Sequence, residues 1–242
     1  MPTMENGDVR IRYEEHGSGF PLLLLAPGGL GGSVVDAWGN APWNPVEAHA
    51  DDFRVIAMDQ RHCGGSTALV SGEDGWGSYA SDQLALLDHL GVEKALVLGM
   101  CIGGTFIARL LTTAPDRFVG AVMLQPTGRD DNEELFSKNF DKFAADRRDE
   151  HPEASDADWT SFKANLYANQ NTLFSVPDTD LAGIATPLLV LCGGDEPHPE
   201  SASRTLVQLA QDATLIERWK TGEHVEPARA NVEDFLALHR PT

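Results

Sequence analysis

The chain has 242 residues, with 37 Asp and Glu against 18 Lys and Arg, so its formal charge at pH 7 is −19. This excess of acidic residues argues against a nucleic-acid partner, because nucleic acids are bound by basic patches. It argues weakly against binding to an anionic membrane surface. No apolar run is long enough to span a membrane. The length suits one α/β domain with a large core.

The N-terminal segment and the cysteines indicate the compartment. Residues Met1–Gly7 have neither the basic region nor the apolar core of a signal peptide. The three cysteines, Cys63, Cys101 and Cys192, cannot all pair. We therefore expect a reduced, cytoplasmic protein. The histidines and cysteines also lack the spacing of metal ligands, so we expect no metal and no cofactor.

Short apolar runs alternate with helical patterns along the chain. Strands are predicted at Val9–Glu15, Leu22–Leu25, Phe53–Met58, Ala95–Leu98, Val119–Leu124, Pro187–Leu191 and Ala213–Trp219. Helices are predicted at Tyr79–Leu90, Thr105–Leu111 and Val232–His239. Regular alternation of strand and helix is typical of a mostly parallel sheet with helices on both faces. We therefore predict an α/β fold.

The alternation lapses between residues 127 and 186. This stretch is polar and acidic, with aromatic residues spaced through it. An insertion of this length inside a compact domain is usually functional. We interpret it as a small helical lid on a core domain formed by residues 1–126 and 187–242. Ordinary surface helices are the alternative interpretation.

A nucleophile turn is predicted at residues 99–103, which read Gly-Met-Cys-Ile-Gly. A strand pattern precedes the turn and a helix pattern follows it, which is the context of the G-x-S-x-G nucleophile elbow, with cysteine in place of serine. Glycine is needed at both ends because a Cβ there would collide with the neighbouring strand or helix. The N-terminus of the following helix would lower the pKa of the Cys101 thiol and favour an oxyanion. A buried cysteine in a glycine-rich turn is the alternative.

Several segments together resemble the α/β-hydrolase family over nearly the whole chain. They are the glycine-rich loop Pro27–Gly32, the segment Met58–Arg61 with Gly65 and Ser66, the run Ser81–Gly91, the elbow, Asp195 with Pro199, and Gly222 with His224. Each segment is weak evidence alone. Their order is strong evidence, because the family places its nucleophile, acid and histidine in this sequence along the chain. The resemblance implies an α/β-hydrolase fold.

The resemblance also implies a role for each matching residue. Cys101 would be the nucleophile, His224 the base, and Asp195 the acid that orients His224. The oxyanion hole would use the backbone N–H groups of Gly29 and Ile102. All of these residues follow the carboxyl ends of parallel strands, where open α/β sheets place their sites.

Other residues compete for these roles or would surround them. Glu196 and Asp130 are alternatives to Asp195 as the acid, and His198 is interpreted as a contact at the rim or lid, not as the base. Substrate contacts are expected from Leu30, Met100, Gln125, Phe140, Phe143 and Phe174.

A cysteine nucleophile favours particular chemistry. Beside a histidine, the thiol can form a thiolate–imidazolium pair before substrate arrives, and a thiolate attacks thioesters and activated or enol esters well. Within the family, dienelactone hydrolases and polyhydroxyalkanoate synthases use cysteine. The run Gly99–Thr105 is similar to the synthase motif, whereas the layout of segments is more similar to that of small carbon–carbon and ester hydrolases.

We therefore expect a cofactor-independent hydrolase with a Cys–His–Asp triad, acting on a small or medium ester, thioester or lactone through an acyl-cysteine intermediate. An acyltransferase that passes the acyl group to an alcohol, amine or thiol is the first alternative. A non-catalytic ligand-binding protein of the same fold is the second, and an intact triad argues against it. The expected partner is a small acyl substrate, with no nucleic acid and no membrane, and the oligomeric state stays open.

Overall fold

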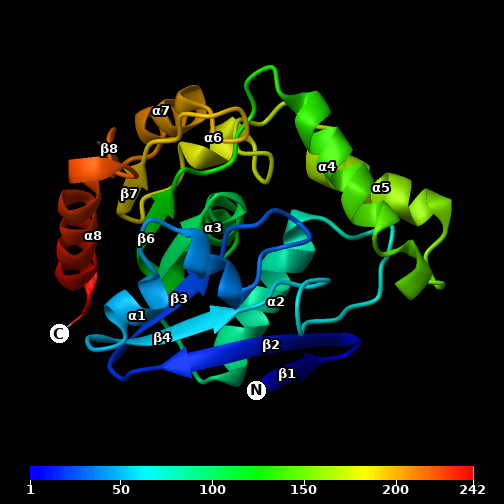
Figure 1. The fold of residues 1–242 in the computed structure, drawn as a ribbon, viewed down its shortest axis with the longest axis horizontal. Helices are drawn as coiled ribbons and strands as arrows, with labels where there is room; N and C mark the ends of the chain where they lie inside the picture. Colours follow the sequence, from blue (N-terminus) through cyan, green and yellow to red (C-terminus); the bar gives the residue numbers. More distant parts are fainter. Residues whose placement is uncertain (242) are drawn as a thin grey trace.

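The computed structural model describes residues 1–241. Within them eight strands form one sheet in the order β1-β2-β4-β3-β5-β6-β7-β8 (Figure 1). The strands are β1 (Thr3–Asn6), β2 (Val9–His16), β3 (Phe20–Leu25), β4 (Phe53–Met58), β5 (Ala95–Met100), β6 (Phe118–Leu124), β7 (Leu188–Leu191) and β8 (Ala213–Ile216). The pairs β1–β2 and β2–β4 are antiparallel, and the other pairs are parallel. The prediction of a mostly parallel sheet is confirmed.

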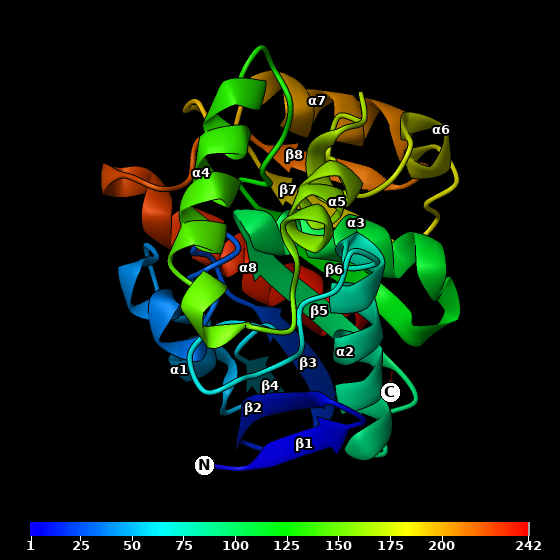
Figure 2. The ribbon, with the colours of Figure 1, turned by 90° about the vertical axis from the view of Figure 1, so that its right-hand side faces the viewer.

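Helices cover both faces of this sheet (Figures 1 and 2). The α-helices are α1 (Pro45–His49), α2 (Trp76–His89), α3 (Ile102–Thr113), α4 (Glu133–Ala145), α5 (Asp156–Tyr167), α6 (Asp178–Leu181), α7 (Glu200–Leu209) and α8 (Val225–His239). The 3-10 helices are η1 (Val35–Asn40), η2 (Pro115–Arg117), η3 (Arg148–Glu150) and η4 (Gly222–His224).

The core lies in two layers, one on each face of the sheet. Along β3, Leu23 and Leu25 join the cluster that includes α2, α3 and α7. The alternate residues Leu22 and Leu24 join the cluster that includes η1, α1 and α8. Successive side chains of a strand point to opposite faces, so a strand covered on both sides must be apolar throughout. This explains why the central strands read as unbroken apolar runs.

Two ends of the fold differ from the sequence pattern. The pattern does not predict β1, because this four-residue strand buries only one side chain, Met4. The last helix starts at Val225, seven residues before the predicted start at Val232, and the last strand ends at Ile216 and not at Trp219. Among residues 1–241, no helix combines the length and apolar character that crossing a membrane requires.

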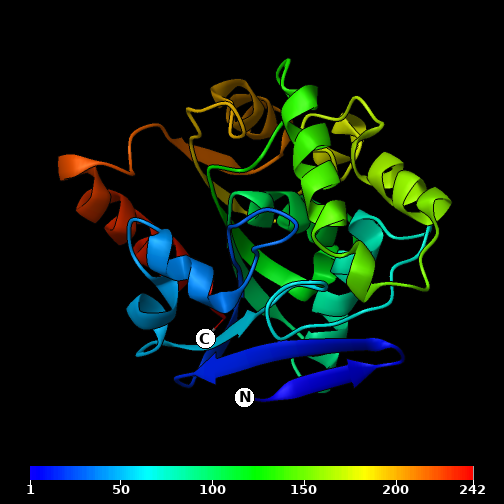
Figure 3. The same ribbon diagram turned by 45° about the vertical axis from the view of Figure 1, so that its right-hand side comes forward.

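The long connection between β6 and β7 carries α4, α5, α6 and η3. Figure 3 shows α4 and α5 standing away from the sheet, on the side where the parallel strands end. The two helices pack on each other through aromatic side chains, with Phe140 and Phe143 of α4 against Trp159 and Phe162 of α5. The aromatic residues of this stretch therefore form a small core of their own.

Candidate active site

Cys101 sits on a strained turn between β5 and α3. Its backbone angles are φ 60° and ψ −120°, a conformation that is uncommon for any residue other than glycine. The surrounding hydrogen bonds hold it there. The Cys101 N–H donates to the Leu124 carbonyl at 3.0 Å, and the Cys101 carbonyl accepts from Gly104 N–H at 3.0 Å and Thr127 N–H at 3.1 Å. The turn thus presents the thiol at the carboxyl edge of the sheet.

The turn contains glycines because a Cβ at these positions would have no room. A Cβ on Gly99 would lie 2.8 Å from the backbone of Gly103, and one on Gly103 would lie 2.3 Å from the Leu25 carbonyl oxygen of β3. A Cβ on Gly104 would lie 2.5 Å from Pro126. Contacts this short force the backbone apart, so the strand–turn–helix geometry requires glycine at these positions.

Cys101 differs from the other two cysteines in exposure and in electrostatics. Its side chain is partly accessible, whereas Cys63 and Cys192 are buried. Burial raises the pKa of the Cys101 thiol, but the adjacent His198 ring and the N–H groups of Gly28 and Ile102 outweigh it, so the pKa falls below its usual value. Burial raises the pKa of Cys63 to about 11 and also raises the pKa of Cys192. Cys101 is therefore the thiol most easily ionised.

The histidine beside Cys101 is His198. Its Nδ1 lies 2.5 Å from Oδ1 of Asp195. Its Nε2 is buried and has no hydrogen-bond partner among residues 1–241. Burial lowers the pKa of His198, but the interactions with Cys101 and Asp195 more than offset this and leave the pKa raised. The interpretation of His198 as a rim contact is therefore corrected by the structure.

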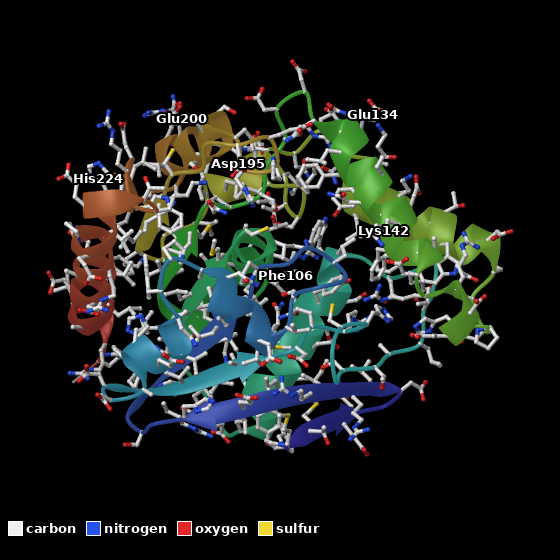
Figure 4. All side chains as sticks on the ribbon, in the orientation of Figure 1. Phe106, Glu134, Lys142, Asp195, Glu200 and His224 are labelled. Atoms are coloured by element: carbon white, nitrogen blue, oxygen red, sulfur yellow. The ribbon has the colours of Figure 1, made fainter. Side chains whose placement is uncertain are left out.

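His224 is not brought to Cys101. It belongs to η4 and precedes the first residue of α8. Figure 4 shows His224 above α8 at the left edge of the molecule, apart from Asp195 near the middle. The chain after β8 reaches the site with another residue, Lys220, and turns away before His224. The Gly-x-His pattern is thus present without the placement that it implies.

A tight turn after β7 places Asp195 and His198 side by side. The backbones of these two residues hydrogen-bond each other in both directions, at 3.0 and 3.4 Å. Gly193 allows the turn to close, because a Cβ there would lie 2.1 Å from the His198 carbonyl oxygen. The turn is also tied to the segment after β6, where Gly128 N–H donates to the Pro197 carbonyl at 3.3 Å. Position 198 is therefore fixed by backbone contacts from two loops.

Asp195 has a second partner in Lys220, in the loop after β8. The Lys220 ammonium donates to Oδ2 of Asp195 at 3.2 Å and to the side-chain oxygen of Gln125 at 2.9 Å. Burial raises the pKa of Asp195, but the interactions with His198 and then Lys220 together outweigh burial and leave the pKa lowered, so the carboxylate form is favoured. Its neighbour Trp219 is buried and donates to the Cys192 carbonyl at 2.8 Å, which anchors the loop. The sequence analysis does not single out Lys220.

A cavity of about 520 Å³ opens onto Cys101 and His198. The glycine-rich loop forms one wall, and α4 with the segment around Phe174 forms the other. The remaining lining residues are Gly28, Gly29, Leu30, Gly31, Gly32, Trp76, Ile102, Thr127, Phe136, Asn139, Lys142, Phe143, Asp146, Arg147, Tyr167, Phe174 and Pro197. Its size suits a small or medium ligand.

The expected substrate contacts divide into two groups. Leu30, Phe143 and Phe174 line the cavity. Phe140 is buried between α4 and α5, Met100 is buried in the sheet core, and Gln125 bonds Lys220, so these three stand outside the lining. For the oxyanion hole, Ile102 and Gly29 both border the cavity, and the N–H beside the thiol from the glycine-rich loop is that of Gly28. Among residues 1–241, no group of three or more His, Cys, Asp or Glu is arranged to hold a metal ion.

The fold and the turn around Cys101 define the class of protein. The pattern of the α/β-hydrolase fold family matches residues 21–183. The chain belongs to this family, and the fold that the sequence implies is confirmed.

Curated relatives match mainly parts of the chain. The chain is 38% identical over 118 residues to RutD of Azorhizobium caulinodans, which is named as a candidate carbamate hydrolase; the match covers 48% of this chain and 41% of RutD. It is 28% identical over 243 residues to RutD of Caulobacter sp. strain K31, with 88% of each chain covered. A 36% match over 104 residues to the soluble epoxide hydrolase of Corynebacterium sp. strain C12 covers 33% of that enzyme. The chain thus spans less than half the length of two of these three relatives.

Solved structures match nearly the whole chain. A meta-cleavage product hydrolase of Pseudomonas fluorescens IP01 has a TM-score of 0.72 at 20% identity, with 98% of each chain covered. The enol-lactonase of Burkholderia xenovorans LB400 has a TM-score of 0.69 at 20% identity, covering 98% of this chain and all of that chain. At this level of identity the likeness demonstrates a shared fold.

Proposed function

We propose that this protein is a cofactor-independent hydrolase of a small or medium ester, thioester or lactone, and that Cys101, His198 and Asp195 are its triad. One observation carries the proposal: the thiol with the lowered pKa and the histidine with the raised pKa line one cavity, and a carboxylate lies 2.5 Å from that histidine. A thiolate–imidazolium pair of this kind is ready to attack before substrate arrives.

In the acylation step the Cys101 thiolate attacks the carbonyl carbon of the substrate. The carbonyl electron pair moves onto oxygen, and N–H groups of Ile102 and the glycine-rich loop stabilise the resulting oxyanion. When this intermediate collapses, the bond to the leaving group breaks and Nε2 of His198 gives it a proton. The products are a free alcohol or thiol and an acyl-Cys101 thioester.

In the deacylation step neutral His198 takes a proton from water through Nε2, and the water oxygen attacks the thioester. The second intermediate collapses, the carboxylic acid leaves, and the sulfur departs as a thiolate. The proton stays on His198, so the starting ion pair is restored. Asp195 holds the ring in the tautomer with Nδ1 protonated throughout, as the acid of a triad does.

The relatives support the proposal at the level of reaction class. RutD is named for carbamate hydrolysis and the Burkholderia enzyme for an enol lactone, and both reactions cleave a bond at an acyl carbon. We also propose that residues 127–186 act as a lid, because Phe143 and Phe174 line the cavity wall opposite the glycine-rich loop.

The test is to trap the acyl-enzyme. Wild-type protein is mixed with 4-nitrophenyl acetate, quenched within the first turnover, and mapped by mass spectrometry of its peptides. We expect acetyl on the peptide that carries Cys101, release of nitrophenolate, and loss of both in Cys101→Ala. Turnover that persists in Cys101→Ala would rule out the proposed nucleophile. If an added alcohol or thiol captures the acetyl group faster than water does, the protein is an acyltransferase and not a hydrolase.

A further inference from the structure

The wall of the catalytic cavity carries a net positive charge at the end of α4, although the chain as a whole is strongly acidic. Three charged residues of the α4 end line it: Lys142, Asp146 and Arg147. Lys142 and Asp146 neutralise each other through a 2.7 Å ion pair. Figure 4 labels Lys142 on α4. Arg147, by contrast, forms no ion pair with any carboxylate among residues 1–241. The cavity therefore has one uncompensated cation besides the catalytic pair.

The Arg147 guanidinium is held in place by neutral groups. Its Nε donates to the His62 carbonyl at 2.8 Å, and its two terminal nitrogens donate to the carbonyls of Gly31 and Phe143 at 3.1 and 3.4 Å. The group also lies over the Phe143 ring, 4.5 Å from its centre. A guanidinium has five N–H donors, so each terminal nitrogen keeps one donor free. The cation is fixed in orientation and still has capacity for a ligand.

The free donors suit an anion in the catalytic cavity better than one on the other side. A second cavity also borders Arg147, but its wall carries Asp8, Glu150 and Glu153, which would repel an anion. The catalytic cavity has apolar walls that include Phe136 and Phe174, and the guanidinium itself lies over the Phe143 ring. Low-polarity surroundings strengthen a charge-assisted hydrogen bond.

We propose that Arg147 binds an anionic group of the substrate, so that the protein acts on acyl compounds with a carboxylate at the end away from the reacting carbonyl. Half esters and half thioesters of dicarboxylic acids, and lactones with a carboxylate side chain, belong to this class. The inference rests on the proposed function for the reacting end of the substrate. It adds a recognition element at the other end, on a guanidinium that bridges Phe143 of α4 and Gly31 of the glycine-rich loop.

The experiment measures binding without turnover. In a Cys101→Ala background, dissociation constants are measured by calorimetry for N-acetylcysteamine thioesters of succinate, glutarate and adipate and for the matching monomethyl esters, which lack the charge. We expect at least one free acid to bind about 10- to 100-fold tighter than its methyl ester, the range expected for hydrogen bonds to a charged group. The preference should shrink as salt rises.

Three variants separate recognition from packing. Arg147→Met should abolish the preference while leaving the affinity for the methyl esters within about twofold. Arg147→Lys should keep part of it, because lysine retains the charge but not the planar fork. Arg148→Met is the matched control: Arg148 is the next residue, its charge pairs with Asp156, and its loss should leave the preference intact.

The proposal is overturned if no free acid binds more tightly than its methyl ester, or if Arg147→Met weakens both forms equally, which would make Arg147 a purely structural contact. No measurable binding of any probe would also contradict it. Failure of the proposed function looks different. In that case the wild-type protein would not turn over any of these thioesters, while the Arg147-dependent binding preference would persist.

Discussion

The turn after β5 supplies the nucleophile of the proposed triad and the turn after β7 supplies its histidine and acid, and the two turns are constrained in different ways. Steric exclusion fixes the glycines of the nucleophile turn, because a Cβ on Gly99 would meet the backbone of Gly103, and a Cβ on Gly103 would meet Leu25 of the neighbouring strand β3. The histidine is placed by contacts between separate loops: the turn Asp195–His198 is tied to the segment after β6, and Lys220 comes from the loop after β8. A position where only glycine fits leaves a pattern in the sequence. A position set by packing between loops leaves little.

The largest expected effect concerns the nucleophile half. Cys101→Ser should lower kcat/KM by about 10⁴-fold or more, by analogy with the loss of an essential triad member. The pH profile should change as well. In the wild-type protein activity should rise through the lowered pKa of Cys101 and fall through the raised pKa of His198, because the reactive form is thiolate with imidazolium.

In the serine variant the hydroxyl does not ionise and needs neutral His198 as a base. Activity should then rise with pH through the pKa of His198 and lack the alkaline fall. Both profiles are measured as rates of 4-nitrophenyl acetate hydrolysis between about pH 5 and 10, a range that brackets the ordinary pKa values of histidine and cysteine. Superimposable profiles for the two proteins would show that the two residues do not act as an ion pair.

Two adjacent glycines test the histidine half. Gly193→Ala should lower kcat/KM about 100-fold, because its Cβ would lie 2.1 Å from the His198 carbonyl oxygen and push the turn away from Cys101. Gly194→Ala is the matched control, since a Cβ there has nothing within 4 Å. Circular dichroism checks that both variants fold. Equal activity of the two variants would mean that the turn does not position the base.

A smaller effect is expected at Lys220, in the loop after β8. Lys220→Met should lower kcat/KM about tenfold, because the ammonium orients Asp195 through a 3.2 Å contact. Since Lys220 lowers the pKa of Asp195, its loss should raise that pKa. The carboxylate is then lost at a higher pH than in the wild-type protein, so its protonation joins that of Cys101 and the acidic limb of the profile should become steeper and move to higher pH. Arg218→Met removes a charge from the same loop and should leave the limb in place. An unshifted limb in Lys220→Met would exclude the positioning role.

The smallest effect concerns the substrate wall. Phe143→Ala should change the relative rates among acetyl, butyryl and hexanoyl esters about three- to tenfold, because its ring lines the cavity and one missing ring or methylene contact is worth a few kcal/mol at most. Phe140→Ala removes an aromatic side chain from the same helix, but this ring is buried against α5. It should lower the melting temperature and leave the chain-length profile unchanged. A chain-length profile that changes in Phe140→Ala but not in Phe143→Ala would contradict the assignment of Phe143 to the cavity and of Phe140 to the packing between α4 and α5.

The sequence predicts the fold and half of the candidate site for physical reasons that can be traced. Buried strands must be apolar throughout, so the alternation of runs predicts the parallel sheet, and steric exclusion at Gly103 marks the nucleophile turn. The motif Asp195-Glu196-Pro197-His198 does carry a signal, because a tight turn brings the first and last side chains together. The pattern Gly222-x-His224 has the expected spacing from β8, yet only the packing of Trp219 and the early start of α8 reveal that His224 faces elsewhere.

The most direct test of this account compares the two histidines. His198→Ala and His224→Ala are assayed side by side for kcat/KM on one activated ester and for the rate at which iodoacetamide alkylates Cys101. We expect His198→Ala to lose about 10⁴-fold in kcat/KM, by analogy with triad dissections, and to alkylate more slowly at neutral pH because the thiolate loses its imidazolium partner. His224→Ala should match the wild-type protein in both measurements. A crippled His224→Ala with an active His198→Ala would contradict the account and return the base to the loop after β8.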